Sequence, residues 1–253
     1  MDLSLKGKRA LITGGSRGIG LAIARTLLAE GAAVGICARG EQGLTAAAGQ
    51  LAEQGTVFHK PVDVSNAEAT TEFVADVADA LGGLDIVVAN ASASVGEGAS
   101  SWANNFSTDL MSFVHLIEAA TPHLENSESA SVVAITSTSA LEAGVLPTAN
   151  SFGALKAAML QHAAAQARLL GPKGIRVNAV SPGPVYFEGG VWETIKNGMP
   201  DLYDAAVASA ALGKLASADD VANAVTFLAS PAAGHITGTN LVVDGAFTNR
   251  FDF

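Results

Sequence analysis

The chain has 253 residues, of which 49% are hydrophobic and 15% are charged, and its formal net charge is −10. Disordered chains are poor in apolar residues and rich in charge, so this composition excludes that class. The acidic balance argues against a nucleic-acid partner, because such binding rests on clustered lysine and arginine. The single cysteine, Cys37, excludes a disulfide framework and a cysteine-based metal site.

Membrane and metal-binding signals are also missing from the sequence. No apolar run approaches the roughly 20 residues that a membrane span needs. The first residues, MDLSLKGKRALITGG, lack the uninterrupted apolar stretch of a signal peptide. The five histidines show no HExxH or other close ligand spacing. We therefore expect a cytoplasmic protein with no membrane partner and no metal.

Short β-branched runs alternate along the chain with longer stretches rich in alanine and leucine. Strands are predicted over residues 9–13, 33–38, 57–63, 84–90, 131–136, 176–180 and 240–244. Helices are predicted over residues 18–30, 42–54, 66–82, 102–124, 151–170 and 217–229. This alternation predicts βαβ units and an α/β fold with a doubly wound parallel sheet covered by helices on both faces. No linker divides the chain, so residues 1–253 are expected to form a single domain.

Residues 184–211 depart from this regular spacing. The segment contains both tyrosines, one of the two tryptophans and several acidic residues. Long irregular segments on an α/β scaffold often cover a binding site. We predict that residues 184–211 form a mobile substrate lid.

A glycine-rich turn, TGGSRGIG at residues 13–20, follows the first predicted strand and precedes an apolar helix. Glycines permit a tight turn and let the backbone approach a diphosphate, which then sits at the helix N-terminus. The flanking strand and helix provide the context that nucleotide binding requires, whereas the alternative is a glycine turn without a ligand. The predicted cofactor contacts in this turn are Gly14, Ser16, Arg17, Gly18, Ile19 and Gly20.

The end of the second predicted strand bears on the choice of dinucleotide. NAD-binding units usually place an acid there to bond the ribose 2′-hydroxyl, but this region has no acid before Glu41. Arg39 stands there instead, and Arg17 lies within the glycine turn. Two guanidinium groups suit the 2′-phosphate of NADP. Either arginine considered alone has an equally good alternative interpretation as a solvated surface charge. The predicted cofactor is NADP(H) rather than NAD(H).

Four segments together carry a family resemblance: TGGSRGIG, VVANAS at residues 87–92, GIRVNAVSPG at residues 174–183 and ITGTNLVVDGA at residues 236–246. With these motifs, the chain resembles the short-chain dehydrogenase/reductase family over its whole length. The resemblance implies a Rossmann fold with a seven-stranded parallel sheet in the order 3-2-1-4-5-6-7, usually in a homotetramer. It also implies hydride transfer between a nicotinamide and a carbonyl or alcohol.

The resemblance assigns further cofactor contacts by position. It implies that Asp63 and Val64 frame the adenine and that Asn90 lines the cofactor cleft. Pro182 and Gly183 would then border the nicotinamide.

The motif that carries the family's chemistry is altered. The family places a tyrosine four residues before a lysine, so that the two side chains share one helix face. The lysine charge lowers the pKa of the tyrosine, which then exchanges a proton with the substrate. Here Lys156 is in place, but Phe152 occupies the tyrosine position and has no proton to donate. The sequence does not distinguish a natural phenylalanine from an engineered one.

Other family positions differ as well. The active-site asparagine, seven residues after a tryptophan in many members, aligns with Asp109, which has three interpretations: it orients a water, it pairs with Lys156, or it is an ordinary surface acid. The threonine of the PGxxxT pattern is Phe187. For the active-site serine, spacing from position 152 favours Ser139, whereas the end of the strand favours Ser137. We predict Ser139.

Two residues of the lid are candidate replacements for the missing phenol. Tyr186 either reaches the nicotinamide or simply packs within the lid, and Glu188 is either a desolvated acid or a solvated loop residue.

Asn178 resembles a family residue that steadies neighbouring backbone, with an ordinary turn asparagine as the alternative. The apolar ending, Phe251 to Phe253, is expected at a subunit interface.

The favoured function is an NADP(H)-dependent oxidoreductase that interconverts a carbonyl and an alcohol on a small or medium apolar substrate with an atypical proton donor. One alternative is a catalytically silent NADP(H)-binding or scaffold protein, which the missing tyrosine suggests. The other is a non-redox lyase on the same fold.

Overall fold

The computed structural model describes residues 2–143 and 150–249. Its main sheet has seven strands in the order β3-β2-β1-β4-β5-β6-β9, and every neighbouring pair is parallel. This confirms the predicted α/β Rossmann fold and its strand order 3-2-1-4-5-6-7. The strands are β1 (Arg9–Thr13), β2 (Ala33–Ala38), β3 (Val57–Pro61), β4 (Ile86–Ala89), β5 (Ser131–Ile135), β6 (Arg176–Pro182) and β9 (Asn240–Val243).

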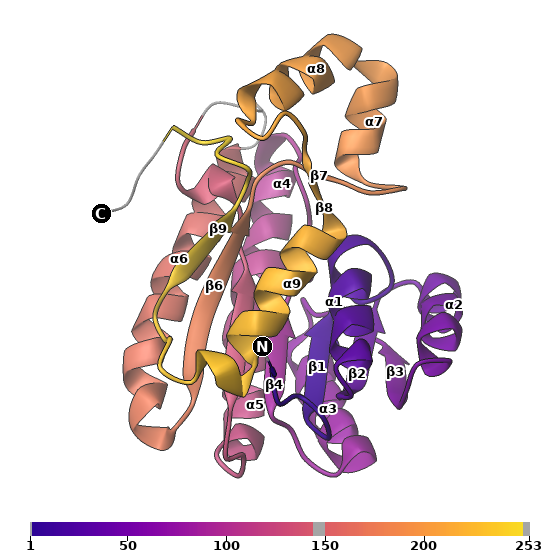
Figure 1. Ribbon diagram of the computed structural model, residues 1–253, viewed down its shortest axis with the longest axis vertical. Helices are drawn as coiled ribbons and strands as arrows, with labels where there is room; N and C mark the ends of the chain where they lie inside the picture. Colours follow the sequence, from indigo (N-terminus) through magenta and orange to yellow (C-terminus); the bar gives the residue numbers. More distant parts are fainter. Residues whose placement is uncertain (1, 144–149, 250–253) are drawn as a thin grey trace.

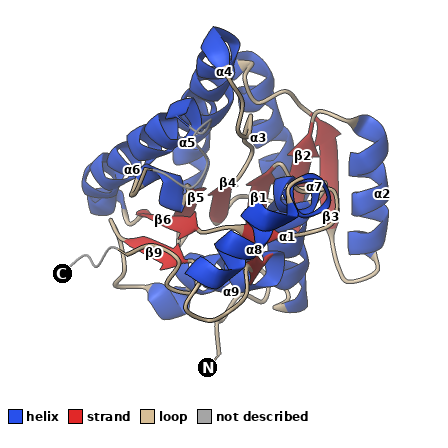
Figure 2. Cartoon of the chain, turned by 90° about the horizontal axis from the view of Figure 1, so that it is seen from above, coloured by secondary structure: helices blue, strands red, loops and turns tan. Residues whose placement is uncertain are grey.

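Helices cover both faces of the sheet (Figures 1 and 2). Side chains of α1 (Gly18–Ala29), α2 (Glu41–Ala52) and α9 (Ala218–Ala229) belong to one hydrophobic core. Side chains of α3 (Ala67–Leu81), α5 (Ser112–Leu124) and α6 (Asn150–Leu170) belong to the core on the opposite face. Short 3₁₀ turns complete the scaffold: η2 (Thr138–Ala140), η3 (Gly171–Lys173) and η4 (Pro231–Ala233).

The central strands contribute to both cores. In β1, Ala10 and Ile12 pack on one face, whereas Leu11 packs on the other. Every residue of β4 and β5 is buried. Strands covered by helices on both faces need apolar side chains on both faces, which explains their uninterrupted apolar sequences. The strand order reverses beside β1, and ligands bind such sheets at the carboxyl ends of the strands around this point.

The predicted helix over residues 102–124 differs from the observed structure. The chain forms α4 (Gly98–Asn105), a π-helical turn η1 (Phe106–Met111) and then α5. A π-helical turn widens the helix and often marks a functional site. Asp109 lies in this turn, and its side chain is buried rather than on the surface.

The segment that includes the predicted lid, residues 184–211, is built of regular elements. It contains β7 (Val185–Tyr186), α7 (Val191–Gly198) and α8 (Pro200–Ser209), and β7 pairs with β8 (Ala216–Ser217). The two helices project beyond the main sheet (Figure 1). They have a small core of their own, formed by Trp192, Ile195, Ala206, Ala210, Leu215 and Phe247. A lid function therefore requires a helical unit to move rather than a loose loop.

Candidate active site

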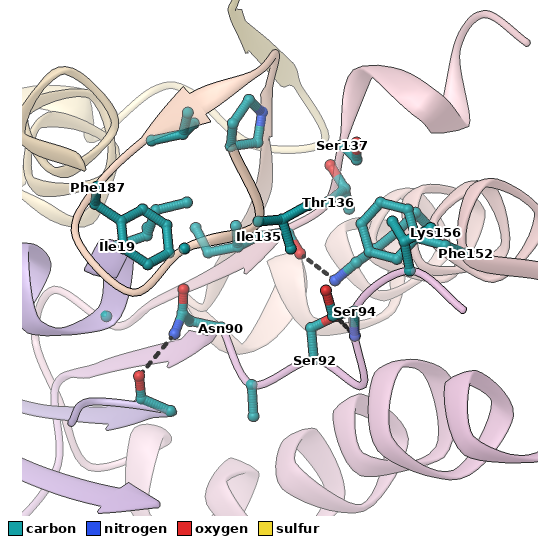
Figure 3. Close-up of a pocket in the computed structure, with 18 of the residues that line it drawn as sticks. Ile19, Asn90, Ser92, Ser94, Ile135, Thr136, Ser137, Phe152, Lys156 and Phe187 are labelled. Atoms are coloured by element: carbon teal, nitrogen blue, oxygen red, sulfur yellow. Dashed lines mark hydrogen bonds between the residues drawn. The ribbon is translucent and has the colours of Figure 1, made fainter. Parts of the chain in front are cut away.

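A cavity of about 1030 Å³ runs from the glycine turn to the start of α6. Nearly every predicted cofactor residue lines it: Gly14, Ser16, Arg17, Ile19, Gly20, Arg39, Asp63, Val64, Asn90, Lys156, Pro182 and Gly183. The predicted catalytic positions Ser139 and Phe152 line it too, as does Ser137. Figure 3 shows Ser137, Phe152 and Lys156 together at one end of the pocket, with Ile19 and Phe187 at the other. Residues distant in sequence therefore form one continuous site.

The geometry of the glycine turn requires its glycines. Gly14 and Gly18 have φ of +70° and +54°, a region that side chains disfavour. A Cβ on Gly20 would lie 2.2 Å from the carbonyl oxygen of Gly14. The residue before α1, Arg17, makes no side-chain cap. The first N–H groups of α1 are thus available for an anion, as a diphosphate requires.

Asn90 fixes the glycine turn to the end of β4. Its side-chain Nδ2 donates to the carbonyl oxygens of Thr13 at 2.9 Å and Gly14 at 3.1 Å. In return, the Thr13 hydroxyl accepts the backbone N–H groups of Asn90 and Ala91. Asn90 therefore lines the cavity, as predicted, and it also holds the backbone that would receive the diphosphate.

The two arginines have different surroundings. The Arg17 guanidinium donates to the Gly189 carbonyl oxygen at 2.7 Å and so connects the glycine turn to the loop before α7. Arg39 is exposed at the edge of the cavity near Asp63. Hydrogen bonds from Ser65 are the main reason why the pKa of Asp63 is lowered, and the Arg39 charge lowers it further. Of these two arginines, Arg39 is the one whose guanidinium is not bonded to residues 184–211.

Lys156 and Asp109 form a buried ion pair. The distance from Lys156 Nζ to Asp109 Oδ1 is 3.0 Å, and the side chains are 2% and 0% exposed. Lys156 Nζ also donates to the Ile135 carbonyl oxygen at 2.9 Å (Figure 3). Of the three interpretations of Asp109, the structure selects the pairing with Lys156. Asp109 itself lies behind the lysine and not on the cavity wall.

Phe152 lies one helical turn before Lys156, and Lys156 Nζ is 5.6 Å from the centroid of its ring. The two serine candidates differ in their bonding. The Ser137 hydroxyl oxygen accepts the backbone N–H of Ser139 at 3.1 Å, which leaves its own proton free to donate into the cavity. Ser139 packs its backbone carbonyl against Gly153 at the start of α6. This geometry favours Ser137, rather than the predicted Ser139, as the donor to a substrate oxygen.

The lid segment contributes residues other than those predicted. The ring of Phe187 lies over Gly18, which explains why Gly18 is missing from the cavity wall. The ring of Tyr186 packs against Tyr203, with a centroid distance of 6.1 Å, and does not line the cavity. Glu188 is exposed, as in a solvated loop. The structure therefore brings neither Tyr186 nor Glu188 to the position of the missing phenol.

Asn178 and the chain terminus were further sequence-based candidates. Asn178 Nδ2 donates to the Ile236 carbonyl oxygen at 2.9 Å, and its Oδ1 accepts the Thr239 N–H at 3.1 Å. This bonding matches a residue that steadies neighbouring backbone. The ending Phe251 to Phe253 lies outside the described residues.

Two features are absent from the described part of the chain, a metal-binding cluster and a membrane-spanning helix. Within residues 2–143 and 150–249, no cluster of three or more histidine, cysteine, aspartate or glutamate side chains could hold a metal ion. In the same ranges, none of the helices is sufficiently long and apolar to span a membrane.

Comparison with known proteins identifies the family. The family model described as enoyl-(acyl carrier protein) reductase matches residues 14–248. The isoepoxydon dehydrogenase patN of Aspergillus clavatus is 42% identical over 251 residues, covering 96% of this chain and 95% of the relative. The chain belongs to the short-chain dehydrogenase/reductase family. Like its dehydrogenase relatives, this short-chain dehydrogenase/reductase is an oxidoreductase.

Solved short-chain dehydrogenase structures share the fold. One from Burkholderia cenocepacia, in complex with NADP, has a TM-score of 0.88 and 33% identity, with 96% of this chain and 98% of that chain covered. An NADPH-bound oxidoreductase from Pseudomonas aeruginosa, described as containing an atypical catalytic center, has a TM-score of 0.89 and 29% identity, with the same coverage. A nicotinamide cofactor therefore fits both the family and the glycine turn of this short-chain dehydrogenase/reductase.

Sequence reasoning missed a group of buried polar residues behind Lys156. Asn105 Nδ2 donates to Asp109 Oδ2 at 2.9 Å, and Asn105 Oδ1 accepts the hydroxyl groups of Ser101 and Ser151. Asn105 and Ser151 are fully buried. Buried polar side chains need partners, so an asparagine four residues before Asp109 on one helix face was the signal that could have revealed this network.

Proposed function

We propose that the protein is an NADP(H)-dependent oxidoreductase that interconverts a carbonyl and an alcohol on a small or medium apolar substrate, with an atypical proton donor. The observation that supports this most is the continuity of the cavity, which joins the glycine turn and Arg39 to Lys156 and Ser137. A volume of about 1030 Å³ reaches the upper end of the range for small-molecule and cofactor sites.

The residues at the glycine turn suit a dinucleotide. The uncapped N-terminus of α1 would hold the diphosphate, because its free N–H groups and helix dipole favour an anion. Arg39 would bind the 2′-phosphate, since the Arg17 guanidinium is bonded to the Gly189 carbonyl. Asp63 and Val64 would frame the adenine, and Pro182 and Gly183 would border the nicotinamide.

The chemistry would use the opposite end of the cavity. A bound nicotinamide supplies or accepts the hydride. Ser137 would donate its free hydroxyl proton in a hydrogen bond to the substrate oxygen and so orient the carbonyl. Lys156 Nζ donates one N–H to the Ile135 carbonyl oxygen and forms an ion pair with Asp109. A remaining N–H of Lys156 would face the cofactor ribose or the substrate oxygen. With no phenol at position 152, this ammonium would give the proton that the reduced carbonyl needs, and a proton from solvent would replace it.

The cavity wall favours an apolar substrate. Val95, Phe152, Trp192 and Phe247 contribute apolar surface to the cavity. The opening beside Lys156 and Ser137 also favours catalysis over a silent binding or scaffold role, because a protein that only bound the dinucleotide would not need this space. A non-redox lyase is disfavoured for the same reason, since Phe152 and Phe187 do not close the cavity.

The test is a carbonyl screen with NADPH, in which loss of the nicotinamide absorbance reports turnover. We expect turnover with at least one apolar ketone or aldehyde. Saturating NADPH binding without turnover across a broad panel of carbonyls and alcohols would contradict the oxidoreductase proposal and favour a binding protein.

Cofactor preference has its own test. We expect Arg39→Ala to weaken NADPH binding about 10- to 100-fold and to leave NADH binding unchanged, because charge-assisted hydrogen bonds contribute about 1.5–3 kcal/mol. Arg25→Ala is the matched control, since Arg25 pairs with Asp219 on the surface and does not line the cavity. Equal losses for NADPH and NADH would refute the assignment of Arg39 to the 2′-phosphate.

We also propose a homotetramer. Trp102 and Phe106, four residues apart on α4 and η1, have exposed fractions of 45% and 52%. Exposed aromatic side chains on adjacent helical turns suit a subunit interface. Sedimentation of the purified protein distinguishes a monomer from a tetramer directly.

A cytoplasmic location also remains a prediction.

A further inference from the structure

A buried charge pair lies at the cavity wall, where Lys156 lines the cavity and Asp109 lies behind it. Beside Phe152, the ammonium group of Lys156 contacts the carboxylate of Asp109 at 3.0 Å, and both side chains are almost fully excluded from solvent. A charge pair at this distance in a buried site interacts strongly and is little screened by salt. The cation therefore does not act alone on its neighbours.

The surroundings of Asp109 hold its carboxylate in this position. Its Oδ2 accepts the Asn105 side-chain N–H at 2.9 Å and the backbone N–H of Ala93 at 3.2 Å, while Oδ1 faces Lys156. Asn105 is in turn fixed by Ser101 and Ser151. A carboxylate that accepts two hydrogen bonds on Oδ2 cannot swing away from the lysine without losing those buried bonds.

The π-helical turn supplies the required geometry. Asp109 lies within η1, between α4 and α5, and its side chain points inward. Lys156 comes from α6, where it also bonds the Ile135 carbonyl at the end of β5. The pair thus joins η1 to α6 at the point where Phe152 faces the cavity.

We propose that Asp109 is a positioning residue that cancels the charge of Lys156 toward position 152, so that Phe152 and Asp109 form one coupled departure from the family pattern. An isolated ammonium group stabilises a nearby phenolate, whereas an ammonium paired with a carboxylate presents only a dipole. A phenol at position 152 would then gain little acidity, which makes phenylalanine a tolerable replacement. The inference deepens the proposed function, since it rests on the same cavity.

The experiment measures the ionisation of a phenol placed at position 152. The variants are Phe152→Tyr and Phe152→Tyr/Asp109→Asn, each titrated by the ultraviolet absorbance of its phenolate. The signal of the parent protein is subtracted, because Tyr186 and Tyr203 are the only other phenols. Leu169→Tyr, with and without Asp109→Asn, is the matched control, since Leu169 lies on the same helix as position 152 and is 64% exposed.

The proposal predicts a difference between the two position-152 variants. In Phe152→Tyr, the added phenol ionises at or above the value of the exposed control, near 10. In Phe152→Tyr/Asp109→Asn, the same phenol ionises about one to three pKa units lower, the usual effect of a nearby unpaired charge. The control phenol shifts in neither background. The pH profile of carbonyl reduction should move to lower pH in the double variant only.

Two results would overturn the proposal. One is a strongly lowered phenol pKa in Phe152→Tyr alone, which leaves the Lys156–Asp109 pair intact and therefore remains informative even if the double variant does not fold. The other is equal values in the single and double variants. A third variant should shift the phenol pKa in the opposite direction. In Phe152→Tyr/Lys156→Met, the remaining Asp109 carboxylate should raise the phenol pKa above that of Phe152→Tyr.

The titration separates this inference from the proposed function. Phenol ionisation needs no turnover, so a protein without carbonyl-reducing activity still tests the charge cancellation. Calorimetry with NADPH on the same samples reports whether the cofactor site is intact. Normal NADPH binding with equal phenol values would refute the role of Asp109 alone, whereas the predicted shift without cofactor binding would refute the proposed function alone.

Discussion

The two ends of the cavity differ in how closely their residues follow the pattern expected of the family. At the glycine turn, the glycines, Asn90 and the uncapped start of α1 agree with the residues expected of a nucleotide site. Around Lys156, the phenol is absent and Asp109 introduces a buried negative charge. One end is retained and the other is altered, within a single scaffold.

Physical chemistry explains this difference. The glycine turn would bind a diphosphate through backbone groups, and its geometry leaves no room for a Cβ at Gly20. The chemistry end depends on single side-chain groups whose shape is nearly preserved when phenylalanine replaces tyrosine. A site built from backbone therefore resists substitution, whereas a site built from side chains can change its chemistry without a change of fold.

The largest expected effect is on the buried ion pair. Lys156→Met should reduce the free energy of unfolding by about 3–5 kcal/mol, because Asp109 is left buried without its partner. Lys60→Met is the control: Lys60 pairs with Asp76 at 2.6 Å, but both side chains are more than a third exposed. Such pairs contribute about 0–1 kcal/mol. Urea unfolding at neutral pH measures both.

A second substitution sharpens this result. Lys156→Met/Asp109→Asn should recover most of the lost stability, since the uncompensated charge is gone and the amide oxygen still accepts the Ala93 N–H. A double variant as unstable as Lys156→Met would mean that the ion pair is not the source of the loss, and that packing of the lysine stem is.

The next effect concerns the glycine turn. Gly20→Ala should destabilise the protein by about 1–3 kcal/mol, because its Cβ would meet the Gly14 carbonyl oxygen at 2.2 Å. It should also abolish measurable NADPH binding. Gly49→Ala, in α2 with no atom near the added Cβ, should be neutral or stabilising by up to about 1 kcal/mol. Unchanged NADPH binding in Gly20→Ala would break the assignment of this turn.

The smallest expected effect is a pH dependence at the cavity mouth. The pKa of Asp63 is lowered, mainly by hydrogen bonds from Ser65 and further by Arg39. A lowered folded-state pKa gives stability that is present above the unfolded value of about 3.9 and is lost as the pH falls through the folded value. Because Asp63 is exposed, Asp63→Asn should cost only about 0.5 kcal/mol at pH 7.

The measurement is the free energy of unfolding in urea, followed from neutral pH into the acidic range where stability falls (the acid limb). In Asp63→Asn, the loss of stability below about pH 4 should be slightly smaller than in the parent. Asp79→Asn, which removes the same charge from the exposed face of α3, is the matched control. Identical acid limbs in the parent and in Asp63→Asn would show that the bonds from Ser65 contribute nothing to folding.

The fold was largely predictable because local patterns determine it. The strand predicted over residues 9–13 coincides with Arg9–Thr13, and the sheet order is confirmed. The helix over residues 102–124 was only partly right, since periodicity does not reveal the π-helical turn around Asp109. That turn depends on tertiary packing against α6, which a local pattern does not contain.

The candidate site was predictable where backbone geometry decides it. The glycine turn, Asn90 and Lys156 lie on the cavity, as expected. Tyr186 was ambiguous because its chain position does not reveal that its ring faces Tyr203. The choice between Ser137 and Ser139 depends on one hydrogen bond, and the contact of Phe187 with Gly18 depends on the path of the lid.

Calorimetric titration of the parent protein and of Arg39→Ala with NADPH and NADH tests the central claim most directly, namely that the nucleotide end of the cavity is retained while the chemistry end is altered. The account predicts that the parent binds NADPH more tightly than NADH and that Arg39→Ala removes this preference. If the parent binds neither dinucleotide, the retained end has lost its function as well, and the account is contradicted.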